Sequence, residues 1–202
     1  MSVAALSEAL PLNGWENFYV IVGSSAAALT GLTFIVITIA ADAAGLANTP
    51  RARLSGLRAF ITPTTVHFAS VLWMSALLSV PGQTVFSLAL CLGISGLAGI
   101  VYCTRVILWM LEILSEYKPF IADWIWSAVL PFFAYACLLA VALLLPGHPV
   151  ASLYVVGGIT LLLLFIGIHN AWDVVAWVTT ERHAHKDRQH RGDHPPKEPS
   201  GR

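Results

Sequence analysis

Residues 18–41, FYVIVGSSAAALTGLTFIVITIAA, decide the structural class of this protein. The stretch contains no charged residue, and it is longer than the roughly 20 apolar residues that cross a bilayer as a helix. The segment before it carries Glu8 and Glu16 and no basic residue, so it does not have the pattern of a cleaved signal peptide. We therefore expect residues 18–41 to remain as a first transmembrane helix, after an extracytoplasmic tail at residues 1–17.

Further long apolar stretches follow, and polar or turn-forming segments separate them. They cover residues 59–80, 84–104, 124–145 and 150–171, and the last is expected to continue as a helix to residue 180. Of the 202 residues, 57% are hydrophobic and only 11% are charged, whereas soluble domains carry roughly 25% charged residues. The predicted fold is therefore all-α: an integral membrane bundle of about five transmembrane helices over residues 18–180. Short Pro-Gly turns predict that the second and third spans, and the fourth and fifth, form antiparallel hairpins.

The basic residues predict the orientation of this bundle. Every Lys and Arg lies between the first two spans, around the connection between spans three and four, or after residue 180. An alternating path of five spans places these three regions on one side of the membrane. Because basic residues favour the cytoplasmic side, the prediction is an outside N-terminus and a cytoplasmic C-terminus.

Residues 181–202 form a charged, His-rich and Pro-rich tail. It has too few apolar groups to offset the entropy of ordering, so we expect it to be disordered. Its Lys and Arg side chains would be attracted to anionic lipid headgroups. Metal binding by its histidines is the alternative interpretation. The net charge of the whole chain is zero and does not indicate nucleic acid as a partner.

Small residues recur at helical spacing in two of the predicted spans. Such stripes let helices approach closely in a membrane. Either stripe would serve packing within one subunit or the formation of a homo-oligomer. The residues concerned are Gly23, Ala27 and Gly31 in the first span, and Gly93, Gly96 and Gly99 in the third.

His67 is the most isolated ionisable residue inside a predicted span. It follows Pro63, which removes a helical hydrogen bond and is expected to kink or open the helix, and Thr64, whose hydroxyl can satisfy freed backbone groups. Ionisable groups in a membrane are candidates for a functional site. His67 would therefore belong to an ion or proton site, or it would be a neutral histidine that is hydrogen-bonded to a neighbouring helix.

A second polar group lies near the cytoplasmic end of the fifth span. His169 and Asp173 are four residues apart and share a helix face with Asn170 close by. Arg105 should reach a similar level on the third span, where an ion pair with Asp173 or Asp123 is plausible. These residues would form a structural clamp at the helix ends or the inner mouth of a pathway, or they would simply face water.

No catalytic or cofactor motif is present in the sequence. There is no HExxH, GxSxG or P-loop pattern, and the 3 Cys lie in apolar runs without metal-ligand spacing. We predict no metal or cofactor. Whether the protein is an enzyme stays open, as does a haem held by His67 and His169.

The stretch GSSAAALTGLTFIVIT at residues 23–38 resembles the opening span of a group of small, uncharacterised bacterial multi-pass membrane proteins. A weaker likeness covers the Asn170-Ala171-Trp172 region. The resemblance implies location in a bacterial inner membrane and no particular activity.

Three functions remain open from the sequence. The first is an oligomeric ion or proton channel, or a transporter-like subunit, because polar residues lie inside the spans. The second is a non-catalytic accessory or assembly protein that binds membrane partners through its small-residue stripes. A membrane enzyme or haem protein is the third and least favoured.

Overall fold

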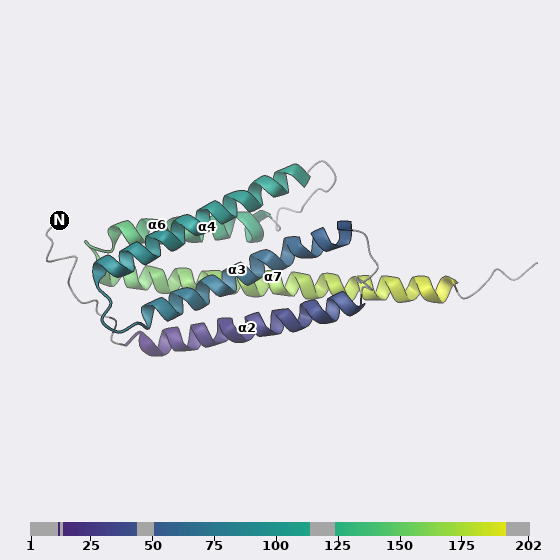
Figure 1. Cartoon of the computed structure of the whole chain (residues 1–202), viewed down its shortest axis with the longest axis horizontal. Helices are drawn as coiled ribbons and strands as arrows, with labels where there is room; N and C mark the ends of the chain where they lie inside the picture. Colours follow the sequence, from purple (N-terminus) through teal and green to yellow (C-terminus); the bar gives the residue numbers. More distant parts are fainter. Residues whose placement is uncertain (1–11, 13, 44–50, 114–123, 193–202) are drawn as a thin grey trace, which may run out of the picture.

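The computed structural model describes residues 12, 14–43, 51–113 and 124–192, and over these ranges the chain forms long helices without strands (Figure 1). The predicted all-α helical bundle is confirmed. The elements in chain order are α2 (Glu16–Ala43), α3 (Arg51–Leu78), α4 (Val85–Ile113), the short π-helix η2 (Ile125–Val129), α6 (Leu130–Leu144) and α7 (Pro149–Gly192).

The lengths and surfaces of these helices suit a bilayer. Within the described residues, 4 stretches are long and apolar enough to cross a membrane, and α3 adds the shorter apolar segment Pro63–Leu78. Large hydrophobic side chains such as Leu90, Ile94 and Leu97 on α4 are exposed on the outside of the bundle. Exposure of so much apolar surface to water would be unfavourable, so long apolar helices with apolar outer faces are the pattern of a multi-pass membrane protein. The spanning stretches are Glu16–Thr38, Val85–Leu111, Ile125–Leu144 and Pro149–Asp173.

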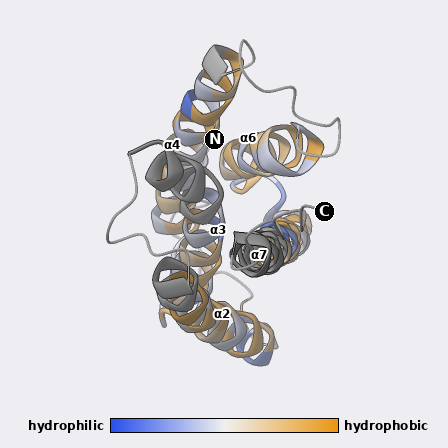
Figure 2. Cartoon of the chain, turned by 90° about the vertical axis from the view of Figure 1, so that its right-hand side faces the viewer, coloured by the Kyte–Doolittle hydropathy of each residue, from blue (hydrophilic) through white to orange (hydrophobic). Residues whose placement is uncertain are grey.

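The helices are arranged as a row of three beside a pair. Seen from one end, α2, α3 and α4 form the row, and α6 and α7 lie next to it (Figure 2). α7 packs extensively against α3 and also against α6, as the hairpin prediction for the last two spans requires. α3 and α4 are joined by a tight turn at Gly82, whose φ is 72°, yet they touch each other only sparsely. The main partner of α4 is α6.

Glycines explain why α4 packs against α6. A Cβ at Gly96 would lie 2.7 Å from the backbone nitrogen of Leu139, and a Cβ at Gly99 would overlap the ring of Tyr135. Gly93 makes an ordinary contact, with Ala142 Cβ at 3.6 Å. The glycine string of the third span therefore lies at a helix contact within the chain.

The small-residue stripe of the first span is only partly in contact with another helix. A Cβ at Gly23 would lie 2.8 Å from Cβ of Ser75, so Gly23 is at the contact between α2 and α3. Ala27 and Gly31 are exposed, and Gly31 has no atom of another element within 4 Å of its Cβ position. Only the N-terminal part of this stripe, at Gly23, is used for packing inside the described chain.

Two prolines inside spans have different local effects. α3 continues as a helix on both sides of Pro63. The kink or local opening expected at Pro63 stays a prediction. Ahead of Pro131 the chain forms the π-helix η2, which is consistent with the missing proline N–H and the steric demand of its ring. α7 continues to Gly192, beyond residue 180 where the sequence predicts the disordered tail to begin. Residues 193–202, and the N-terminal tail up to residue 11, lie outside the described residues.

Candidate functional site

His67 faces a neighbouring helix of the protein. Its side chain is 1% exposed, and its Nδ1 lies 3.3 Å from the hydroxyl oxygen of Tyr135 on α6. Tyr135 is also buried, and its hydroxyl lies 2.8 Å from Oγ of Ser70, one turn along α3 from His67. The Tyr135 hydroxyl therefore forms hydrogen bonds with two residues of α3.

The direction of these hydrogen bonds follows from counting protons. The Ser70 hydroxyl donates its single proton to the carbonyl oxygen of Val66, at 2.8 Å. Tyr135 must then donate its proton to Ser70 Oγ, and Nδ1–H of His67 donates to the Tyr135 oxygen. In a neutral imidazole this arrangement leaves Nε2 of His67 without a proton, as a hydrogen-bond acceptor.

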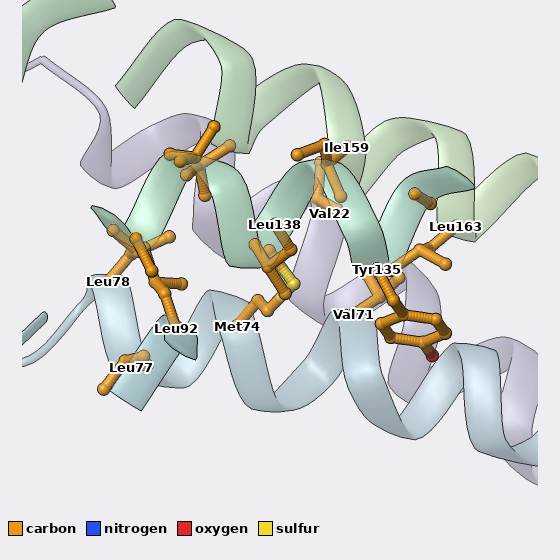
Figure 3. Packing of buried hydrophobic residues seen from close by; sticks show 14 of the residues in the cluster. Val22, Val71, Met74, Leu77, Leu78, Leu92, Tyr135, Leu138, Ile159 and Leu163 are labelled. Carbon is orange, nitrogen blue, oxygen red and sulfur yellow. The ribbon is translucent and has the colours of Figure 1, made fainter. Parts of the chain in front are cut away.

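Tyr135 is held in place by α4 as well. Its ring lies against the backbone of Gly99, where a side chain would collide with it. In Figure 3 the ring extends from α6 toward α3 beside Val71. The close approach of α4 to α6 therefore supports the residue that orients His67.

Several buried polar atoms lack a hydrogen-bond partner among the described residues, including the Tyr102 hydroxyl on α4, and two of them are nitrogens in the interior. One is Nε2 of His67, and the other is Nδ2 of Asn170 on α7, whose residue is 5% exposed. A buried donor or acceptor without a hydrogen bond destabilises a folded protein by about 1–3 kcal/mol, so such atoms are expected to have a partner. Thr64, which is fully buried, lies one helical turn from His67 toward the N-terminal end of α3.

The polar group of the fifth span contains a close contact between His169 and Asp173. Nδ1 of His169 lies 3.2 Å from Oδ2 of Asp173, an ion-pair distance, although the two groups are not aligned as a hydrogen bond. The ring of His169 is stacked on the indole of Trp126, with centroids 4.0 Å apart and an interplanar angle of 7°. Trp126 belongs to η2, so the π-helical turn and α7 meet at this stack.

Arg105 does not join this group. It is exposed on α4, and the ion pair suggested between Arg105 and Asp173 is absent from the part of the chain that the structure describes. The reason is that α4 packs against α6 and diverges from α7 at this end of the bundle (Figure 1). The alternative partner, Asp123, lies outside the described residues.

An apolar layer separates His67 from the end of the bundle at which α3 ends and α7 begins. Val71 and Met74 of α3 and Leu138 of α6 are buried there side by side (Figure 3). Beyond the layer, the hydroxyls of Ser75 and Tyr19 are buried and unpartnered among the described residues. Buried polar groups therefore occur on both sides of the layer but do not form one continuous chain.

The structure brings together some predicted site residues and adds others. His67, Thr64 and Asn170 lie in the interior, His169 and Asp173 lie on the rim, and the two histidines face different aromatic partners. No group of three potential metal-ligating side chains is found within the described ranges. Sequence reasoning did not include Tyr135 or Trp126 among the candidate site residues. The only signal for Tyr135 was a phenol in the middle of an apolar span.

No protein-family model matches this chain, and no curated protein or solved structure shows detectable similarity to it.

Proposed function

We propose that this protein is a proton-conducting subunit of a bacterial inner membrane, with His67 as the residue that takes up the proton inside the bundle. The observation that carries the proposal is that His67 is fully buried, with Nδ1 at 3.3 Å from the Tyr135 hydroxyl and with Nε2 unpartnered among the described residues. Imidazole is the side chain best suited to exchange a proton near neutral pH.

Access to His67 would come from the cytoplasmic side. Asn170, Thr64, His169 and Asp173 provide polar groups on that side, of which His169 and Asp173 reach the surface. On the other side, the layer of Val71, Met74 and Leu138 excludes a continuous polar chain. The described state is then a closed one, in which the proton reaches His67 from inside and crosses outward only when that layer moves.

The positions of the charged residues support a cytoplasmic location for that end. The first turns of α3, the end of α4 and the extension of α7 all lie at the same end of the bundle (Figure 1). These segments contain Arg51, Arg53, Arg58, Arg105 and the basic run after residue 180. The positive-inside rule assigns this end to the cytoplasm, with the N-terminus outside.

The proposal is tested by proton flux into liposomes that contain the purified protein and carry an imposed pH gradient. Wild-type protein should dissipate the gradient, and His67→Ala should abolish the flux. His148→Ala is the matched control, because His148 is an exposed histidine between α6 and α7 and lies outside the proposed path. Equal flux in wild type and His67→Ala would remove His67 from the mechanism, and absence of flux at every gradient and voltage would refute conduction.

A second candidate function is supported by α2. The exposed positions Ala27 and Gly31 form a small-residue surface that no described element covers, which is suited to close packing against another membrane helix. The protein would then be an accessory or assembly subunit. Crosslinking through Gly31→Cys in native membranes should capture a partner or a second copy, whereas Gly158→Cys on α7, another open position, should not. Failure of Gly31→Cys to capture any protein would argue against this function.

A further inference from the structure

The two unpartnered nitrogens in the interior are chemically complementary. The hydrogen-bond chain through Tyr135 and Ser70 makes Nε2 of His67 an acceptor that needs a donor. Nδ2 of Asn170 is a donor that needs an acceptor. They do not bond to each other directly, because neither atom has a hydrogen-bond partner in the described chain.

The register of α3 against α7 brings these residues to nearly the same level. Gly167 of α7 touches Phe68 of α3, since a Cβ at Gly167 would lie 2.8 Å from Cδ1 of the Phe68 ring. The helices run antiparallel (Figure 1). Asn170 lies three residues beyond Gly167 toward the cytoplasm, and His67 lies one residue beyond Phe68 in the same direction. At 1.5 Å per residue the two differ in height by about 3 Å.

The side of α7 that carries Asn170 also faces the interior. Leu163 and Ile166, which precede Asn170 by seven and four residues, are fully buried, so Asn170 continues the buried face of this helix. Asn170 itself is 5% exposed. Asn170 therefore lies on the buried side of α7, at about the level of His67 on α3.

We infer that a single buried water molecule bridges His67 and Asn170. The water donates one proton to Nε2 of His67 and accepts from Nδ2–H of Asn170, which satisfies both groups together. A molecule that is both donor and acceptor is required, because an ion or a pure acceptor would leave one nitrogen unpaired. The inference deepens the proposed function: this water is the immediate proton donor to His67, and Asn170 is the residue that positions it.

The site is tested by solid-state NMR of the full-length, ¹⁵N-labelled protein in lipid bilayers, where transfer of magnetisation from water to the His67 ring is measured. His67 is assigned by the loss of its signal in His67→Ala. We expect Nε2 to have the shift of a non-protonated ring nitrogen and to receive magnetisation from water. Asn170→Leu should abolish that transfer, whereas Thr160→Val, a buried polar substitution further out on α7, should preserve it.

A wild-type spectrum without transfer from water to His67, or with a protonated Nε2 in the neutral ring, would overturn the inference. Unchanged transfer in a folded Asn170→Leu protein would overturn the assignment of Asn170. The wild-type measurement needs no substitution, so it decides the existence of the water even where Asn170→Leu fails to fold. Magnetisation transfer from water to His67 in a protein without proton flux would retain the water site and refute the proposed function. Proton flux without this transfer would retain the proposed function and refute the water site.

Discussion

The ring of Tyr135 on α6 lies against the backbone of Gly99 on α4, in the space where any other residue would place its Cβ. The hydroxyl of the same tyrosine reaches across to His67 and Ser70 on α3. One side chain thus joins α6 to both neighbours, at a place where α3 and α4 make few contacts of their own. Gly99 in the third span and His67 in the second span therefore both contact Tyr135.

Gly99→Ala should displace the Tyr135 ring and destabilise the protein. Overpacking of this kind typically costs about 1–3 kcal/mol. Gly158→Ala is the matched control, because its Cβ meets nothing within 4 Å and alanine favours a helix over glycine by roughly 0.5–1 kcal/mol. Thermal unfolding in detergent should show a lower midpoint for Gly99→Ala and an equal or higher one for Gly158→Ala. Equal midpoints for the two variants would contradict the contact.

Gly96→Ala should be more harmful than Gly93→Ala. A Cβ at Gly96 would press on the backbone of Leu139, which cannot turn away, whereas a Cβ at Gly93 meets a methyl group at 3.6 Å. Loss of close packing between α4 and α6 should lower the unfolding midpoint only in the first variant. A folded, equally stable Gly96→Ala protein would contradict the close approach of α4 to α6 at Leu139.

Tyr135→Phe should keep the packing and break the hydrogen-bond chain. The expected loss is about 1 kcal/mol, because buried hydrogen bonds within membranes are worth modest net amounts. Ser70→Ala removes the other end of the same bond. In a double-mutant cycle measured by unfolding, the two losses should therefore be non-additive by roughly 0.5–1.5 kcal/mol. Strict additivity would mean that the Tyr135 and Ser70 hydroxyls are not bonded.

Trp126→Ala should loosen the contact between η2 and α7, since it removes the ring on which His169 is stacked. Aromatic stacks of this kind contribute about 0.5–1.5 kcal/mol beyond their buried area. Trp126→Phe retains an aromatic face and should recover most of the loss. Proteolysis rates near the start of α6, measured in liposomes, should rise in Trp126→Ala and remain near wild type in Trp126→Phe. Equal rates in all three proteins would exclude a structural contribution from the stack.

The orientation is tested by labelling single cysteines with a membrane-impermeant thiol reagent. The background variant has Cys91, Cys103 and Cys137 replaced by alanine. His148→Cys, in the exposed turn between α6 and α7, should react in intact cells. Asp173→Cys, whose parent side chain is 45% exposed at the other end, should react only after the membrane is opened. The opposite pattern would reverse the assignment of inside and outside.

Much of the fold was predictable from the sequence because it depends on local composition. An uncharged run such as residues 18–41 must form a helix in a bilayer, where each backbone polar group needs an internal partner. The pairing of helices was only partly predictable. A short turn suggested that α3 and α4 pack together, but α4 packs mainly against α6, because Gly96 and Gly99 allow a closer approach there.

The candidate site was predictable to the same limited degree. His67 and Asn170 were recognisable as polar residues in apolar spans, since burial of such groups in a membrane is costly wherever they occur. Their partners were not recognisable. Tyr135 is far from His67 in the sequence, and Arg105, which seemed close to Asp173 in depth, is on a helix that leaves α7 at that end. Depth along a span follows from counting residues, whereas direction around the helix axis depends on packing.

The sequence by itself determined the class of this protein: long uncharged runs, short Pro-Gly turns and a one-sided distribution of basic residues act locally and need no partner. The tertiary structure alone decided which residues meet. It placed Tyr135 on Gly99 and against His67, left Gly31 open, and set the two unpartnered nitrogens of His67 and Asn170 at one level. The physical reason is that lipid provides no preference among apolar helix faces, so close packing of small residues against large ones selects the neighbours.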